Sequence, residues 1–312
     1  MSDDAPVNLR AVADYFGLAG TAPVEKDMHV VRAIRAVTSI DAGPFTLVFG
    51  GGTALARAHK IVRRMSEDVD FKIVPRPATP ISRNGLRRAL GRLGDQVTQS
   101  LLDAGFKFDP KDKACNHSQN ENRYTVWQIP YDSPDGAGQG LRPTIQIELT
   151  YAPLRQAPVT LPVSSFVAEA HQHPPEIPAL PCVSVPQTAA EKLVALTRRT
   201  AMDLAGLSRD ADPALVRHIY DLHLMRNLVD HDAVARMARE IAAADADEHR
   251  NQYPAYHADI AGETHKALDA LRTDPIHRAR YTEFVAAMVY GENVEFREAM
   301  STVTDLASRG LA

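Results

Sequence analysis

Residues 46–74, TLVFGGGTALARAHKIVRRMSEDVDFKIV, decide the fold of this chain. The run from Thr46 to Phe49 is β-branched and aromatic, which is typical of a buried strand. Three glycines at 50–52 break the run, and the alanine-rich stretch that starts at Thr53 predicts a helix. The chain then returns through a second apolar strand. The stretch therefore predicts a strand, a glycine turn, a short helix and a strand.

Two aspartates, Asp68 and Asp70, stand two residues apart on the second predicted strand. Side chains alternate along a strand, so the two carboxylates share one face, roughly 7 Å apart, while Val69 faces the core. Neighbouring carboxylates repel unless a cation lies between them. Mg²⁺ held by two carboxylates normally binds substrate phosphates as well.

Neither feature is specific alone, because most glycine clusters are turns and D-x-D is common on solvated strand faces. Their combination is more informative. Glycines allow backbone N–H groups to approach a triphosphate, and the start of a helix attracts anions. The pattern therefore indicates a site for nucleotidyl transfer.

The motifs GGTALA (51–56) and RMSEDVDF (64–71) resemble the signature of the polymerase-β-like nucleotidyltransferases, in the AbiEii/AbiGii branch of toxins. The resemblance is tight over 50–72 and looser over 145–225. It implies an α+β fold: a nucleotidyltransferase lobe with a mixed sheet and helices, followed by a mainly α-helical C-terminal lobe. We expect these lobes at 1–165 and 180–312.

The resemblance also implies a metal-dependent enzyme that uses an NTP with Mg²⁺ or Mn²⁺. The expected metal ligands are Asp68, Asp70 and Glu148. The expected nucleotide-binding residues of the first lobe are Gly51, Gly52, Thr53 and Arg64. Glu148 lies on a predicted strand at 142–150, at the place where the family more often has Asp. A solvated glutamate on an edge strand is the alternative.

The second expected motif is TAAEKLVALTRRT (188–200), in which Lys192 and Arg199 return to nearly one helix face. The resemblance makes Lys192 a phosphate ligand and a catalytic residue, with Arg199 as a further nucleotide ligand. A plain surface helix is the alternative. Asp221 matches the late aspartate of the family and is the remaining catalytic candidate. Its other interpretation is an exposed ion pair with Arg217.

The rest of the chain is assigned by periodicity. We expect helices at 7–18, at 24–40 and from an N-cap at Ser82 to about Asp103. A strand at 123–131 and a loop at 132–140 precede the strand of Glu148. No assignment is made for the polar stretch 106–122. The proline-rich stretch 153–186 is interpreted as a connection to the second lobe, and helical patterning continues from there.

The charge distribution and the apolar content indicate which kinds of partner and compartment to expect. The net charge is −4, yet 57–92 carries ten Lys/Arg and three Asp/Glu, a net of +7. Such a tract suits a polyanion, although a solvated helix face is equally compatible. No apolar run approaches the ~20 residues of a membrane span. The N-terminus lacks the pattern of a secretory signal, and two cysteines suit a reducing compartment, so we expect a cytoplasmic protein.

Three functions remain open. The resemblance suggests an RNA acceptor, in particular a tRNA 3′ end whose blocking would stop translation, and a cognate antitoxin encoded by a neighbouring gene. The alternatives are a nucleotidyltransferase for a small-molecule acceptor and a non-catalytic protein that binds NTP or RNA. Ser66 is either a turn residue or a phosphorylation site on the carboxylate face.

Overall fold

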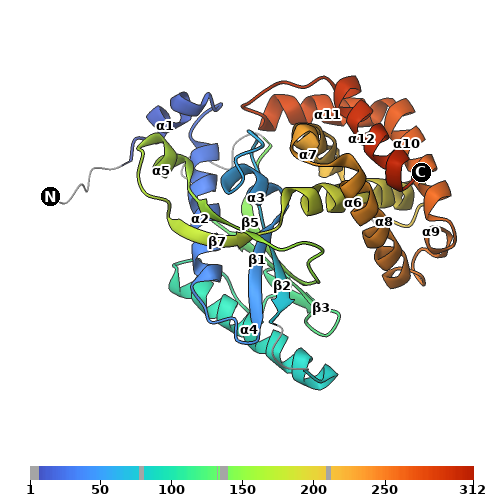
Figure 1. Cartoon of the computed structure of the whole chain (residues 1–312). Coiled ribbons are helices and arrows are strands. Elements are labelled where there is room, and N and C mark those ends of the chain that lie inside the picture. Colours follow the sequence, from blue (N-terminus) through green and yellow to red (C-terminus); the bar gives the residue numbers. More distant parts are fainter. Residues whose placement is uncertain (1–6, 77–80, 132, 134–139, 209–211) are drawn as a thin grey trace. The chain divides into compact units, whose positions relative to one another are not determined.

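The computed structural model describes residues 7–76, 81–131, 133, 140–208 and 212–312 (Figure 1). The chain divides into two compact units. One consists of Met1–Lys60 and Arg64–Val183, and we call it the sheet unit. The other consists of Ile61–Arg63 and Ser184–Ala312, and we call it the helical unit.

The described residues of the sheet unit form a seven-stranded mixed sheet of order β3-β4-β5-β2-β1-β7-β6. The two central strands β1 and β2 are antiparallel, whereas β5 runs parallel to β2 and β7 runs parallel to β1. The strands are β1 (Phe45–Gly50), β2 (Asp68–Pro75), β3 (Asn116–Gln119), β4 (Tyr124–Pro130), β5 (Thr144–Tyr151), β6 (Val159–Val163) and β7 (Ile177–Cys182).

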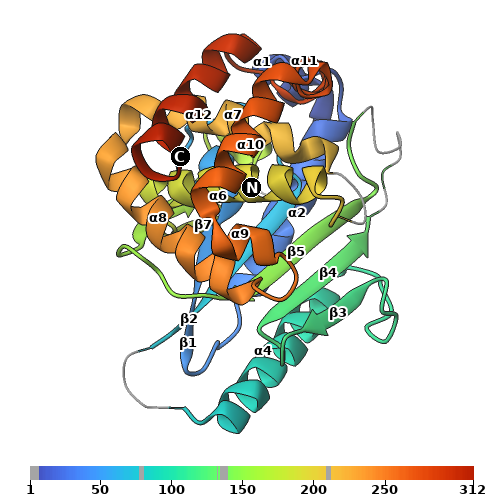
Figure 2. The same cartoon turned by 90° about the vertical axis from the view of Figure 1, so that its right-hand side faces the viewer.

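The helices of this unit pack on the sheet or on one another. They are α1 (Leu9–Phe16), α2 (Ala22–Thr38), α3 (Gly51–Arg57), α4 (Arg83–Asp103) and α5 (Phe166–Ala170). The buried stripes of α2 and α4 join the strand residues in one core, and both helices lie along one face of the sheet in Figure 2. Trp127, fully buried in this core, donates from Nε1 to Thr98 Oγ1 of α4 at 3.0 Å. The opposite face of the central strands therefore remains for polar side chains.

Most predicted elements of the sheet unit are confirmed within a few residues. Ser82 caps α4 as predicted, and its Oγ accepts from Gly85 N at 3.2 Å. The helix expected at 24–40 begins earlier, at Ala22, because Pro23 is well tolerated in a first helical turn. The unassigned stretch 106–122 contributes the short strand β3. The expected loop 132–140 lies mainly outside the described residues.

One expectation was wrong. The stretch 153–186 is more than a connection, because it contains β6, α5 and β7. The strand β7 pairs with β1 at Phe49 and Cys182, and β6 pairs with β7. The many prolines hid these strands, since proline is unusual inside a sheet and is found mainly in edge strands. The sheet of the first unit therefore extends to Cys182.

The described residues of the helical unit contain seven α-helices and two short 3₁₀ turns, as the helical patterning predicted. They are α6 (Val185–Leu204), α7 (Arg217–Met225), α8 (His231–Glu248), α9 (Pro254–Ala258), α10 (Ile260–Thr273), α11 (Pro275–Met288), α12 (Phe296–Gly310) and the turns Pro213–Val216 and Arg226–Leu228. Within the described residues, no helix combines the length and the apolarity that a membrane crossing requires.

Candidate active site

Three carboxylates project from one face of the neighbouring strands β2 and β5. The parallel register sets Asp68 opposite Gln146 and Asp70 opposite Glu148. The residues between them, Val69 and Ile147, are fully buried. Because side chains alternate along a strand, Asp68, Asp70 and Glu148 all face away from the core. The prediction that Asp68 and Asp70 share a face is confirmed, and Glu148 belongs to a central strand rather than an edge strand.

The glycine turn lies directly against Asp70. Gly51 has a φ of +70°, and a Cβ placed on it would be 1.8 Å from Asp70 Oδ2. A side chain at 51 would therefore collide with the carboxylate and would also be strained by the left-handed backbone. The turn and one metal-ligand candidate are thus in contact.

Gly52 likewise leaves no room for a side chain, here because of Arg64 and Ser66. A Cβ at this position would be 2.4 Å from Arg64 Nη2 and 2.9 Å from Ser66 Oγ. The buried Arg64 also donates from Nη1 to Met65 O at 2.8 Å. The guanidinium of Arg64 is therefore next to the turn, as a phosphate ligand requires.

Thr53 fastens the turn to the start of β2. Its buried hydroxyl donates to the carbonyl oxygen of Asp68 and lies 2.9 Å from Ser66 Oγ. The Thr53 side chain is thus engaged in positioning Asp68. Any contact of Thr53 with a nucleotide would be made through its backbone.

Arg142 is a site residue that the sequence did not reveal. Its Nη2 donates to Asp68 Oδ1, and its Nη1 donates to Gln146 Oε1 at 3.1 Å. Gln146 in turn donates from Nε2 to Glu148 Oε1 at 2.5 Å. A second donor to Glu148 is the hydroxyl of Tyr124, whose pKa is raised by burial and by this carboxylate. Polar contacts thus join Asp68 to Glu148 through Arg142 and Gln146.

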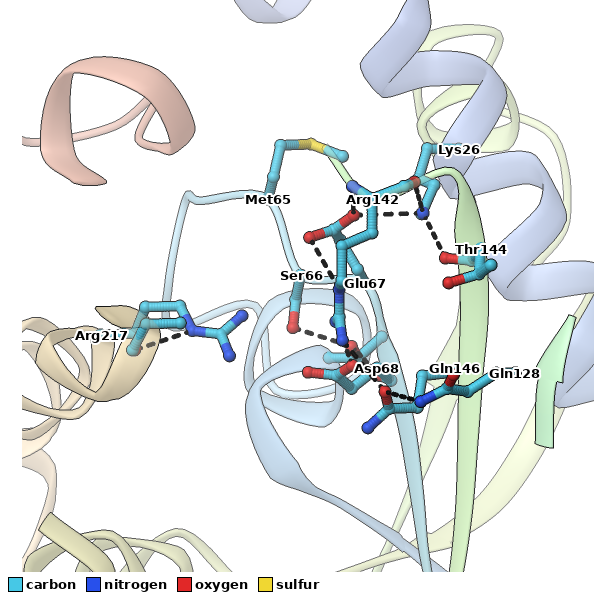
Figure 3. Close-up of polar contacts among 12 residues, drawn as sticks. Lys26, Met65, Ser66, Glu67, Asp68, Gln128, Arg142, Thr144, Gln146 and Arg217 are labelled. Atoms are coloured by element: carbon cyan, nitrogen blue, oxygen red, sulfur yellow. Dashed lines mark hydrogen bonds and ion pairs between the residues drawn. The ribbon is translucent and has the colours of Figure 1, made fainter. Parts of the chain in front are cut away.

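A buried ion pair lies next to Arg142 (Figure 3). Lys26 of α2 is fully buried, and its Nζ lies 3.1 Å from Glu67 Oε1. Burial lowers the pKa of Lys26, and the charge of Glu67 opposes this shift. Glu67 is 3% exposed and approaches Arg142 Nε with Oε2, at 3.5 Å. Local sequence patterns do not indicate this pair, because Lys26 lies on α2 and Glu67 directly precedes β2, so the two meet only in the folded chain.

The carboxylate set suits a hard divalent cation, because Mg²⁺ and Mn²⁺ prefer oxygen ligands. Among the described residues, no group of three or more His, Cys, Asp and Glu side chains is arranged to hold a metal ion. Mg²⁺ usually takes only one or two carboxylates and completes its shell with substrate phosphates and water. Asp68 and Asp70 beside a glycine turn fit that kind of site.

In the helical unit, Lys192 and Asp221 form a buried ion pair. Lys192 Nζ lies 2.9 Å from Asp221 Oδ2 and 3.3 Å from His218 Nδ1. Asp221 is fully buried, and Lys192 is 6% exposed. Burial and the charge of Lys192 set the pKa of His218 well below its usual value, so the imidazole is neutral.

This pair corrects one interpretation of the sequence. The carboxylate of Asp221 is not exposed, as a surface ion pair with Arg217 would require, but is fully buried against Lys192. His218 contacts the same lysine. Lys192 and Arg199 also differ in burial, because Arg199 is exposed and pairs with Asp212 at 2.9 Å.

The basic tract 57–92 is less uniform than its composition suggests. Arg57 and Arg64 are buried, and Arg57 pairs with Asp27 at 3.2 Å. Positive charge at the surface is concentrated on α4, where a hollow of about 390 Å³ opens. Its lining residues are Arg87, Arg88, Gly91, Arg92, Asp95 and Asn122.

A strand, a glycine turn and a D-x-D strand at the centre of a mixed sheet define a nucleotidyltransferase fold. Residues 32–302 match the family model described as nucleotidyl transferase AbiEii toxin of type IV toxin–antitoxin systems. The chain therefore belongs to the AbiEii family of nucleotidyltransferase toxins, and the resemblance seen in the sequence is confirmed. Membership implies the use of an NTP and an antitoxin partner.

Among solved structures, the chain is similar to MenT4, a nucleotidyltransferase toxin from Mycobacterium tuberculosis H37Rv. The TM-score is 0.51 at 16% identity, over 98% of this chain and 100% of MenT4. At that identity the likeness supports the fold alone, and it confirms the predicted α+β class. A search of curated proteins gave no match.

Proposed function

We propose that the protein transfers a nucleoside monophosphate from an NTP to the 3′ hydroxyl of an RNA, specifically a tRNA, and thereby blocks translation in the cytoplasm. One observation carries the proposal: the glycine turn and Asp70 are in contact at Gly51. Backbone groups suited to a triphosphate thus lie beside a carboxylate suited to its metal ion.

In this reaction the acceptor oxygen forms a bond to the α-phosphorus, the bond to the β-phosphate oxygen breaks, and pyrophosphate leaves. The hydroxyl proton is released to water. Asp68 and Asp70 would hold Mg²⁺ or Mn²⁺, with Glu148 beside Asp70 as a candidate third ligand, and the ion would stabilise negative charge on the phosphates. Gly51 and Gly52 present backbone N–H groups to the β- and γ-phosphates. Arg64 adds positive charge beside the turn.

The helical unit supplies the other proposed residues. Lys192 is a candidate ligand for the phosphates, and Asp221 keeps its ammonium charged and oriented by direct contact. Arg199 is a further candidate cation. For the acceptor, the exposed arginines of α4 favour a nucleic acid over a small neutral molecule.

Labelled transfer distinguishes the candidate functions. The protein is incubated with each α-labelled NTP, total tRNA and Mg²⁺ or Mn²⁺. Label on tRNA supports the proposal, label on a small molecule supports the alternative acceptor, and nucleotide binding without transfer supports a non-catalytic protein. Asp68→Ala and Asp70→Ala should each lose transfer and toxicity while remaining folded. The exposed Asp103 at the end of α4, which does not line the arginine hollow, offers a charge-matched control, Asp103→Ala, which should keep transfer.

A further inference from the structure

The backbone at Arg142 is fixed by the buried ion pair. Glu67 Oε1 accepts from Arg142 N at 2.6 Å. Lys26 Nζ donates to Arg142 O and to Thr144 O, both at 2.6 Å. A fully buried ammonium and a nearly buried carboxylate thus hold both sides of one residue. None of these three contacts uses the Arg142 side chain, so they remain in any variant at this position.

The side chain of Arg142, by contrast, is only partly buried. It is 39% exposed, compared with 4% for Glu67 and 19% for Asp68. It binds the carboxylate of Asp68 and, through Gln146, reaches Glu148. An arginine with a fixed backbone and a partly exposed side chain can exchange one partner for another, and here one partner is a proposed metal ligand.

We propose that Arg142 is a tethered cation that neutralises Asp68 until a divalent cation binds, and that it then contacts the phosphates of the NTP. This inference rests on the proposed function. Asp68, Asp70 and Glu148 together carry three negative charges, of which Arg142 balances one. A cation that binds Asp68 has to compete with this ion pair, because the guanidinium occupies Oδ1.

Two effects of opposite sign follow. Removing the guanidinium leaves Asp68 available and makes the carboxylate face more negative, so a divalent cation alone binds more tightly. The same change removes a cation that can bind two phosphate oxygens at once, so the NTP binds less tightly. A residue with a merely structural role would weaken both, because it would disturb the carboxylates and the turn together.

The test uses Arg142→Gln and Arg142→Lys in the full chain. Mn²⁺ binding without nucleotide is measured by electron paramagnetic resonance, and NTP binding is measured by calorimetry with Mn²⁺ at saturation. For Arg142→Gln we expect Mn²⁺ affinity to rise about tenfold and NTP affinity to fall about tenfold, a typical effect of one close charge. Arg142→Lys, which keeps the charge, should lie between the wild type and Arg142→Gln in both measurements.

Arg10→Gln is the matched control, because Arg10 is an exposed arginine of the same unit whose side chain pairs only locally with Asp14. It should leave both affinities unchanged. Unchanged or weaker Mn²⁺ binding in Arg142→Gln would overturn the inference, even if the wild type transfers nucleotide to tRNA. If the wild type transfers nothing but Arg142→Gln still binds Mn²⁺ more tightly, the proposed function fails and the competition at Asp68 stands.

Discussion

Gly51 and Asp70 are in direct van der Waals contact across the start of the site. The Asp70 carboxylate occupies the space into which a Cβ on Gly51 would project, because that Cβ would lie 1.8 Å from Asp70 Oδ2, and the φ of Gly51 is +70°. Both properties require glycine at this position. The contact fixes the distance between the turn and the carboxylate, because neither can move without opening a gap at Gly51.

Gly51→Ala should therefore lose NTP binding and transfer. The methyl group has to displace Asp70 or the turn, and the left-handed backbone adds strain of about 1–2 kcal/mol. Gly94→Ala is the control, since Gly94 lies inside α4 with no atom within 4 Å of an added Cβ. It should raise stability by about 0.5–1 kcal/mol and leave transfer unchanged. Calorimetric NTP binding and urea unfolding check both variants. Normal NTP binding by Gly51→Ala would contradict the prediction.

The buried pair of Lys192 and Asp221 makes single substitutions difficult to interpret. Removing either partner leaves a charge without its buried counter-ion, which costs about 3–5 kcal/mol. Lys192→Met and Asp221→Leu should each lower the free energy of unfolding by that amount. A loss of activity in either single variant would then report stability as much as chemistry.

The double variant Lys192→Met/Asp221→Leu separates the two effects. Replacing a whole buried pair by apolar residues is often neutral for stability. We expect the double variant to unfold near the wild-type urea concentration and to transfer no nucleotide. If it folds well and keeps wild-type transfer, the pair has a structural role alone.

The sequence predicted the centre of the fold because its signals there are local. The apolar run at 46–49, three glycines and alternating aspartates each act within a few residues, and their register follows from the strand period. The stripes of α2 and α4 are likewise visible in their own spacing. The strands β6 and β7 escaped detection because prolines interrupt them, and the pairing of β7 with β1 is a long-range property.

The same distinction explains the site residues that the sequence missed. Arg142 contacts Asp68 only because β5 lies parallel to β2, which no local pattern specifies. Lys26 looks like an ordinary surface lysine in its helix, yet the fold buries it against Glu67. The burial of Asp221 could not be read from its own helix, because its partner Lys192 lies on another helix.

Ser66 precedes β2 rather than lying within it, and its Oγ is close to the glycine turn. Ser66→Asp should impair NTP binding, because it adds a negative charge where the triphosphate is proposed to bind and competes for Arg64. Ser66→Ala removes one contact of Thr53, whose hydroxyl still donates to the Asp68 carbonyl, so it should bind NTP nearly as well as the wild type. Titration of NTP into both variants tests this. Equal affinity would mean that Ser66 is structural only.

The last prediction concerns the pH dependence of stability. Asp27 of α2 is 4% exposed, pairs with Arg57 and accepts from Phe166 N at 2.6 Å. Burial raises the pKa of Asp27 from 3.8 to about 6, although Arg57 opposes the shift. Between these values the unfolded chain binds fewer protons than the folded chain, so stability falls as pH rises.

The linked change in the free energy of unfolding is about 3 kcal/mol over the whole titration, of which about 2 kcal/mol falls between pH 4 and pH 6. Asp27→Asn resembles the protonated carboxyl and cannot titrate, so its stability should vary less with pH in this window. Arg57→Met removes the charge that opposes the shift and should extend the fall in stability above pH 6. Urea unfolding of the three proteins at half-unit pH steps measures the slopes. If the stability of the wild type had the same slope from pH 4 to 6 as that of Asp27→Asn, Asp27 would not titrate in this window and would be ionised throughout it.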